Sequence, residues 1–192
     1  MILRTLRDCS PFIACGLIST FTEWRVGTLV AFGLSLLLMV VAVRGDGLRG
    51  AVLEISAVVF CGGAAAVAYS APHLPVRVFV GALSTGWLAL TVWGTFALGR
   101  PCTEAAERRH VADEVRRHPA FRRAHRVMTA IWGVAFTATA VVLVVEAEAP
   151  HPGLAEVGIQ LAGNLLPAAC VSWCRARRFG PVRSRPRPAT DA

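Results

Sequence analysis

The sequence predicts an all-α fold, a polytopic bundle of transmembrane helices. The prediction depends on its composition and on the pattern of its apolar runs. Of the 192 residues, 55% are hydrophobic and only 17% are charged, and the mean hydropathy is +0.55. A soluble domain of this size needs more polar surface to cover its core. The apolar runs lack the alternation of β-strands and are apolar on every face, unlike the amphipathic helices of a soluble protein. We therefore predict a single bundle over residues 1–174, without a separate soluble domain.

Five apolar runs are candidates for the helices of this bundle. Each is about long enough for a helix to cross ~30 Å of hydrocarbon. None holds more than one formal charge, which favours insertion into lipid. The predicted spans are 26–43, 51–70, 78–98, 127–145 and 154–174.

The distribution of arginine predicts the orientation of the bundle. All twenty basic residues are arginine, and alternating spans place sixteen of them on one side of the membrane, eight within residues 99–126 alone. The 146–156 loop on the opposite side carries three glutamates and no arginine. Arginine-rich short loops stay on the side from which a chain inserts. We predict a multi-pass protein of the bacterial cytoplasmic (inner) membrane, with 99–126 and the C-terminus in the cytoplasm.

The N-terminal segment 9–22 is apolar but short. Fourteen residues give only ~21 Å of helix, too little to cross an ordinary bilayer without local thinning. Three interpretations remain open: an interfacial or re-entrant helix, a thin sixth span, or an uncleaved signal-like segment. We favour a short helix that does not span the membrane.

The arginine-rich connection 99–126 is predicted to be helical. Thr103 can cap a helix that runs through Arg117, and Pro119 can start another that continues into the fourth span. The apolar face of the first helix is weak, so contact with anionic phospholipid would depend mainly on arginine. The tail 175–192 mixes arginine with proline, and we expect it to be disordered at the same surface, with binding to nucleic acid the less favoured alternative.

Tryptophan positions give a second indication of depth. Trp93, Trp132 and Trp173 each fall near the predicted cytoplasmic end of a span, where indole rings prefer the headgroup region. Trp87 lies deeper and is expected to pack between helices.

The fifth span carries a polar face made of Glu156, Gln160 and Asn164, at four-residue spacing. Polar groups in hydrocarbon are costly unless paired, so this face must meet other helices or a wet cavity. One interpretation is a path for a small solute or an ion, with Pro167 loosening the nearby backbone. The other, which we favour, is hydrogen bonding between helices.

Small residues at four-residue spacing predict close packing of helices. The same faces could support a homodimer. They are Gly27, Ala31 and Ser35; Gly81, Thr85 and Ala89; and Thr129, Gly133 and Thr137.

Residues that carry chemistry form no recognisable catalytic pattern. The six cysteines include no CxxC motif; Cys102, Cys170 and Cys174 could hold a soft metal, but small apolar packing is the favoured interpretation. His110, His118 and His125 lie among arginines and are interpreted as solvated. Because the usual enzyme signatures are missing, we predict no enzymatic activity, cofactor or metal.

The connection and the start of the fourth span resemble a known family. GRPCT at 99–103, Arg108, and the stretch FRRAHRVMTAIWGVAF at 121–136 are similar to the GRPFTxxYAR and NRxxTxxWxxxF motifs of an uncharacterised family of bacterial integral membrane proteins. The layout also resembles intracellular septation protein A. Cys102, Ala106 and His125 depart from the motif, which has Phe, Tyr and Asn there. The residues that match are Gly99, Arg100, Pro101, Thr103, Arg108, Arg126, Thr129 and Trp132.

The resemblance implies topology more than mechanism. The likeness to septation protein A implies a role in envelope maintenance or division through contacts with other membrane proteins. The alternative function is a small transporter or channel that uses the polar face of the fifth span.

Overall fold

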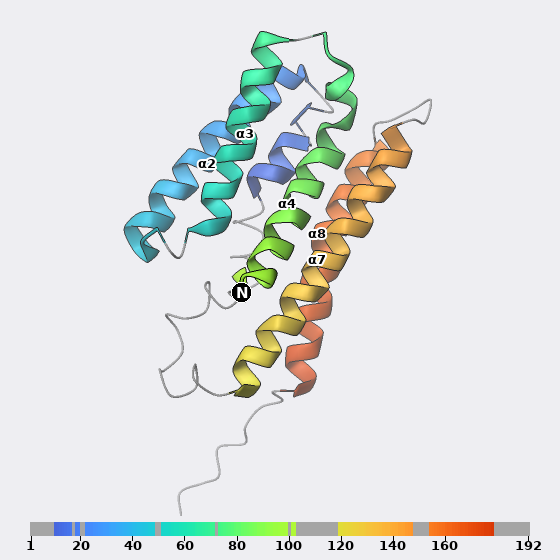
Figure 1. Cartoon of the computed structure of the whole chain (residues 1–192). Helices are drawn as coiled ribbons and strands as arrows, with labels where there is room; N and C mark the ends of the chain where they lie inside the picture. The colour runs from blue at the N-terminus through green and yellow to red at the C-terminus, as the bar shows by residue number, and fades with distance from the viewer. Residues whose placement is uncertain are drawn as a thin grey trace, which may run out of the picture.

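The structure is a computed structural model that describes residues 10–16, 18–19, 22–48, 51–71, 73–99, 101–102, 119–147 and 154–178. These residues form helices, turns and connections, with no strand among them, which confirms the all-α class (Figure 1). The elements are α2 (Trp24–Asp46), α3 (Val52–Ser70), the 3₁₀ helix η1 (Pro75–Phe79), α4 (Val80–Ala97), α7 (Pro119–Ala147) and α8 (Leu154–Arg178).

Each predicted span overlaps one of these helices. The third predicted span, 78–98, overlaps the end of η1 and the whole of α4. Four of the described helices are long and apolar enough to cross a membrane, judged by length and composition. They cover Trp24–Gly45, Val52–Ser70, Val80–Ala97 and Pro119–Ala147. A fifth crossing by α8 remains a prediction, although this helix has 25 residues.

The prediction that Pro119 starts a helix continuing into the fourth span is confirmed. The helix α7 runs without interruption for 29 residues from Pro119. Proline suits a first helical position because its missing N–H would have no intrahelical partner there. The helix predicted from Thr103 to Arg117 lies outside the described residues, as does the tail after 178.

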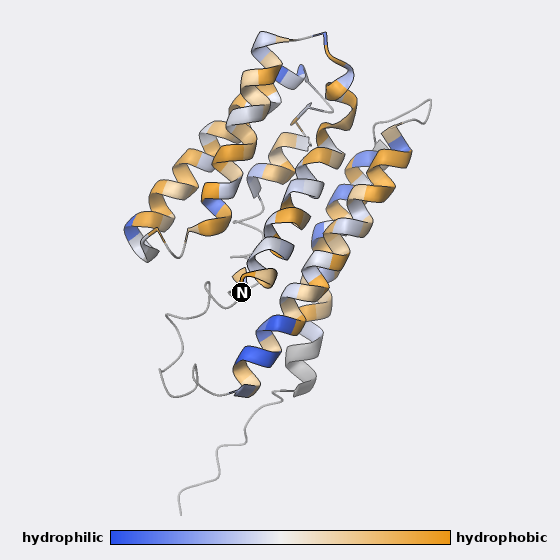
Figure 2. Ribbon diagram, viewed as in Figure 1, coloured by the Kyte–Doolittle hydropathy of each residue, from blue (hydrophilic) through white to orange (hydrophobic). Residues whose placement is uncertain are grey.

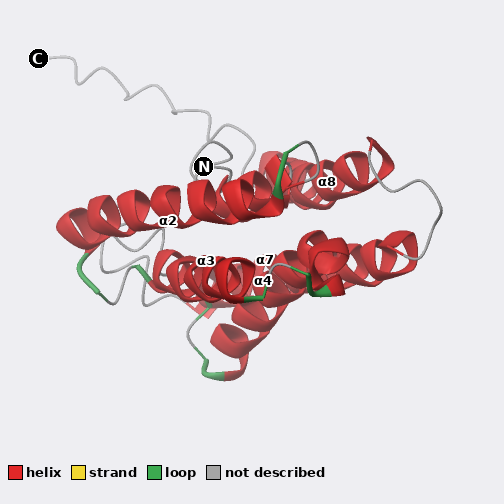
Figure 3. Cartoon of the chain, turned by 90° about the horizontal axis from the view of Figure 1, so that it is seen from above, coloured by secondary structure: helices red, strands yellow, loops and turns green. Residues whose placement is uncertain are grey.

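The helices run alternately in opposite directions. The end of α2, the end of α4 and the start of α7 therefore lie toward the same end of the bundle (Figure 1). Viewed from above, α2 and α8 form one layer, and α3, α4 and α7 form the other (Figure 3). The main pairings are α2 with α3, α4 with α7, and α7 with α8, while α3 and α4 touch over a smaller area.

The N-terminal segment is a short helix inside the bundle. Residues 10–16 and 18–19 are helical, and Phe12 and Cys15 are 1% and 0% exposed. The Phe12 ring packs on Phe60 of α3, with centroids 5.7 Å apart. The segment appears in dark blue between the α2–α3 pair and the helices α4 and α8 (Figure 1). The segment is therefore a short helix buried within the described bundle. We call the described residues 10–16 and 18–19 the N-terminal helix.

Two of the three small-residue faces pack inside the bundle, as predicted, and the third does so in part. Both the 27/31/35 and the 81/85/89 faces are fully buried. On α7, Thr129 and Gly133 are buried, whereas Thr137 is exposed and its hydroxyl accepts a hydrogen bond from the Trp93 indole of α4 (3.1 Å). Trp87 also packs between helices as expected, donating to the Ser56 carbonyl of α3 (3.1 Å). The homodimer remains a prediction.

One prediction for α7 is wrong. His125 is not solvated, because it is 2% exposed and its ring lies 4.4 Å from that of Phe121. Trp132 is 5% exposed and packs on Phe136, so its ring faces protein, and its position at the level of the headgroups remains a prediction. His125 and Trp132 are seven residues apart, with Met128 three residues after the first and four before the second. All three share one buried face of α7, which is turned toward the other helices. Trp93 and Trp173 remain partly exposed, at 37% and 56%.

Candidate functional site: a polar contact between the N-terminal helix and α8

The polar face of α8 points into the protein. Gln160 and Asn164 are 3% and 2% exposed, and Glu156, one turn earlier, is half-buried. Residues four apart lie on the same face of a helix, so one rotation of α8 turns all three toward the protein. Hydrogen bonding between the polar face and another helix was the favoured interpretation, and Gln160 bears it out.

The side chain of Gln160 reaches the N-terminal helix. Its Nε2 donates a hydrogen bond to the backbone carbonyl of Phe12, at 3.2 Å. A Cβ atom added at Gly16, one turn further along that helix, would overlap the Gln160 amide. Glycine at position 16 therefore creates the space into which the amide fits. The contact joins the two ends of the described chain.

Asn164 is bonded within its own helix. Its Nδ2 donates to the Gln160 carbonyl at 2.8 Å, the common bond of a short polar side chain to the preceding turn. Its Oδ1 is buried and has no hydrogen-bond partner among the described residues. An unsatisfied buried acceptor costs about 1–3 kcal/mol. This oxygen is a buried acceptor of the polar face with unused hydrogen-bonding capacity among the described residues.

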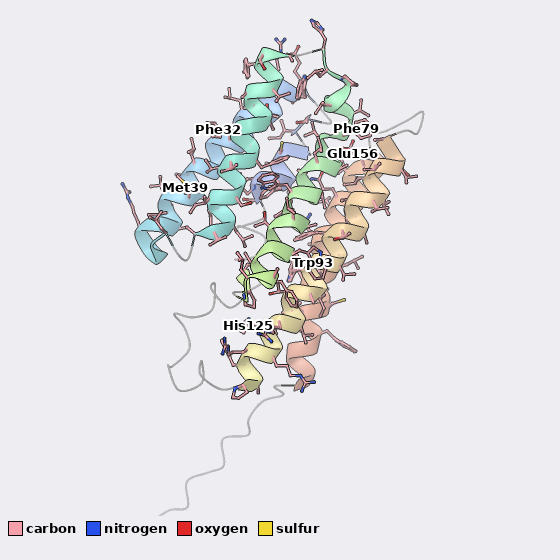
Figure 4. The ribbon with its side chains drawn as sticks, viewed as in Figure 1. Phe32, Met39, Phe79, Trp93, His125 and Glu156 are labelled. Atoms are coloured by element: carbon pink, nitrogen blue, oxygen red, sulfur yellow. The ribbon has the colours of Figure 1, made fainter. Side chains whose placement is uncertain are left out.

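Glu156 lies against the start of α4. A Cβ atom added at Gly81 would overlap a carboxylate oxygen of Glu156, so the acid packs directly on the backbone of the first turn of α4. Figure 4 labels Glu156 beside Phe79, the residue before α4. The N-terminal end of a helix carries partial positive charge, which favours an anion. Glu156 also lies in the first turn of α8, where the same effect stabilises it.

A close approach of α7 and α8 holds the polar face in place. A Cβ atom at Gly163 would overlap the hydroxyl of Thr139 and would come within 2.9 Å of its Cβ. Pro167, four residues later, has no N–H to donate to the Gly163 carbonyl. The helix nevertheless continues through Pro167, which is buried. The absence of a side chain at Gly163 therefore lets α7 and α8 pack closely at the turn where Pro167 removes a backbone hydrogen bond.

The described residues of the family motif do not gather at one site. Gly99 follows α4 with a φ of 68°, a conformation that favours glycine, and its N–H donates to the Phe96 carbonyl at 3.0 Å. Pro101, Thr129 and Trp132 are buried, whereas Arg126 is exposed. The motif therefore divides between core packing and an exposed charge. Arg100, Thr103 and Arg108 lie outside the described residues.

A basic surface lies at the start of α7. Arg122, Arg123 and Arg126 are all exposed, and Figure 2 shows this end of α7 as the most hydrophilic part of the helix. Arg44, near the end of α2, is exposed toward the same end of the bundle. His125 lies among these arginines but turns inward (Figure 4). Exposed guanidinium groups at one level suit binding of anionic groups such as phosphates.

Sequence reasoning identified α8 as one half of the polar contact and missed the other. Any backbone carbonyl could accept the Gln160 amide, so no sequence signal marks Phe12. Gly16 belongs to no small-residue repeat. Among the described residues, no group of three or more His, Cys, Asp or Glu side chains could hold a metal ion.

Comparisons with known proteins add no relative. No family model, curated protein or solved structure matches the chain. The resemblance to the uncharacterised family and to septation protein A accordingly remains a prediction from the motif residues. The described fold itself is that of an all-helical protein with several helices apolar enough to span a membrane.

Proposed function

We propose that this chain is a five-span protein of the bacterial cytoplasmic membrane that acts by binding other membrane proteins of the envelope or division machinery, and not by catalysis. The resemblance to septation protein A motivates the choice of partner. Four apolar helices and the arginine distribution support the membrane location.

The observation that carries this proposal is the burial of the α8 polar face. A transport path requires polar side chains that face water along the route of the solute. Gln160 and Asn164 are instead 97% and 98% covered by protein, as their exposures of 3% and 2% indicate. The Gln160 amide bonds to the N-terminal helix. A polar face used for internal packing supports an interaction protein over a transporter.

The outer surface offers two zones for partners. Along α2, large apolar side chains such as Leu29 (50%) and Leu37 (61%) are exposed to whatever surrounds the bundle. Lipid chains or the helices of other membrane proteins suit this zone. The basic end of α7 suits the headgroups of anionic phospholipid, at ~1 kcal/mol per arginine.

Photocrosslinking in cells tests the proposal. A photoreactive residue is placed at Val30, which is exposed on α2, or at Arg123, and at buried Phe136 as the matched control. We expect adducts with envelope or division proteins from positions 30 and 123 only, together with an envelope defect on deletion of the gene. Adducts with lipid alone, combined with normal envelope growth, would overturn the proposal.

A transporter is the second candidate, because the Asn164 Oδ1 atom is buried without a partner among the described residues. Asn164→Ala removes this oxygen. If the chain is an interaction protein, we expect this variant to change the stability of the bundle without changing solute or ion flux into proteoliposomes. A flux that is present in the wild type and lost in a still-folded Asn164→Ala would favour transport instead.

A further inference from the structure

The described helices form two packed parts. One is the antiparallel hairpin of α2 and α3, and the other consists of α4, α7 and α8. Within each part the helices pack extensively, whereas α3 and α4 touch over a smaller area. In the order of the helices, one connection, from Ser70 to Pro75, leads from the hairpin to the second part. Two units joined by a contact of limited area are expected to move relative to each other.

The direct contact between the two parts centres on one turn of α3 and one turn of α4. The Trp87 indole donates to the Ser56 hydroxyl at 2.8 Å, and the rings of Phe60 and Trp87 lie 5.9 Å apart. The Thr91 hydroxyl gives its only proton to the Trp87 carbonyl at 2.9 Å, so the Ser56 hydroxyl is the donor in its 2.6 Å bond with Thr91. The two residues of each helix are four positions apart and therefore lie on one side of one turn. A contact that is well bonded but confined to one turn can serve as a pivot.

The N-terminal helix contacts both parts (Figure 1). On the side of the hairpin, the Phe12 ring lies 5.7 Å from the Phe60 ring of α3. A Cβ atom added at Gly27 of α2 would overlap the Ser19 hydroxyl, so the helix also packs directly on α2. On the side of the second part, the Gln160 amide of α8 donates to the Phe12 carbonyl at 3.2 Å. Phe12 therefore meets the hairpin through its ring and the second part through its backbone.

The Phe12 ring fills the core where the two parts meet. It is 1% exposed and belongs to one apolar cluster with Ala57 of α3, Val92 of α4 and Ala168 of α8. Truncation of a buried ring leaves a cavity into which the surrounding structure relaxes. Because this cavity would lie between the two parts, relaxation would change the angle between them.

We propose that the N-terminal helix fixes the angle between the two parts of the bundle, which turn about the Ser56–Trp87 contact when this helix is displaced. The apolar zone of α2 and the basic end of α7 lie on different parts. The seating of the N-terminal helix would thus set how these two surfaces are oriented toward each other. The proposal requires no partner, so it can fail while the proposed function stands.

Distances between spin labels on the full-length protein in lipid nanodiscs test the proposal. The labels are attached to a ketone-bearing unnatural residue, which leaves the native cysteines in place. The cross-part pair is Leu37 of α2 with Val134 of α7, and the internal pair is Leu98, after α4, with Val145 of α7. All four side chains are exposed. We expect the wild type to give one narrow distance for each pair.

Two variants displace the N-terminal helix. Phe12→Ala removes the ring that meets α3, and Gln160→Leu removes the amide that holds the helix from α8. In each variant the distance of the cross-part pair should broaden or divide into two, while that of the internal pair stays narrow. Leu143→Ala is the matched control, because it truncates a buried residue of α7 outside the Phe12 cluster, and it should leave the cross-part distance narrow.

The internal pair separates loss of the junction from loss of the fold. An unchanged cross-part distance in both variants would overturn the proposal. Equal broadening of both pairs would also overturn it, because the N-terminal helix would then support the whole bundle and not the angle between its parts.

Discussion

The side-chain amide of Gln160 on α8 donates a hydrogen bond to the backbone carbonyl of Phe12, 148 residues earlier in the chain. An isolated helix as short as residues 10–19 is unstable, because helix nucleation is costly and few bonds follow it. The N-terminal helix therefore depends on tertiary contacts, and the Gln160 bond is one that can be removed by a single substitution. It ties the first described helix to the last.

Gln160→Leu should destabilise the bundle. The substitution keeps the approximate volume of the side chain but leaves the Phe12 carbonyl without the amide that now donates to it. We expect a loss of about 1–2 kcal/mol in the free energy of unfolding. Thermal or denaturant unfolding in detergent measures it. Leu165→Ala, at a position 50% exposed on the same helix, is the control, and an equal loss in both variants would contradict the role given to Gln160.

Two glycines of α8 should respond to alanine with opposite signs. At Gly163 a new Cβ would meet Thr139, a stiff β-branched residue, so α7 and α8 must move apart at a cost of roughly 1–3 kcal/mol. At Gly158 a new Cβ would meet no atom within 4 Å. Gly158→Ala should therefore be neutral or stabilising, because alanine is the better helix former. Unfolding of both variants under one set of conditions tests the pair, and a stabilised Gly163→Ala would show that the helices are not in contact there.

The α3–α4 contact should depend on the Trp87 indole. Its Nε1 donates to the Ser56 carbonyl at 3.1 Å and to the Ser56 hydroxyl at 2.8 Å. Trp87→Phe keeps an aromatic ring and removes the donor, so we expect a loss of about 1 kcal/mol. Trp173→Phe, at a ring 56% exposed, should change stability much less. Equal stability of the two variants would contradict a stabilising role for the Trp87 hydrogen bond.

The helix ranges could be predicted because lipid imposes a length and an apolar composition on each crossing. Pro119 likewise indicated the start of α7, because proline lacks the backbone N–H that has no intrahelical partner at the first helical position. The rotation of each helix about its own axis could not be predicted in the same way. A run that is apolar on every face does not indicate which face packs against the core. His125 lies among arginines and is therefore predicted to be solvated, yet it faces inward. Trp132 is placed only by its distance from the end of a span, which does not show that its ring faces the core. The polar face of α8 lies on one side of the helix, so its position inside the bundle could be predicted. Its partner, the Phe12 carbonyl, could not be predicted.

The basic end of α7 should bind anionic lipid. Arg122, Arg123 and Arg126 are exposed, so replacing all three with glutamine should weaken binding by ~1 kcal/mol per residue, roughly fivefold each. Native mass spectrometry with phosphatidylglycerol measures the change. Arg25→Gln, at the start of α2 and the other end of the bundle, is the control and should have little effect. Undiminished binding by the triple variant at low salt would exclude this surface.

The central claim is that lipid surrounds these helices and that the arginine-rich connections lie in the cytoplasm. Topology reporters fused after residues 48, 73, 150 and 192 test it most directly, with a fluorescent protein that folds only inside the cell and a phosphatase that is active only outside. We predict fluorescence after 48 and 192, and phosphatase activity after 73 and 150. The reverse pattern, or recovery of the unfused chain in the soluble fraction without detergent, would contradict the account.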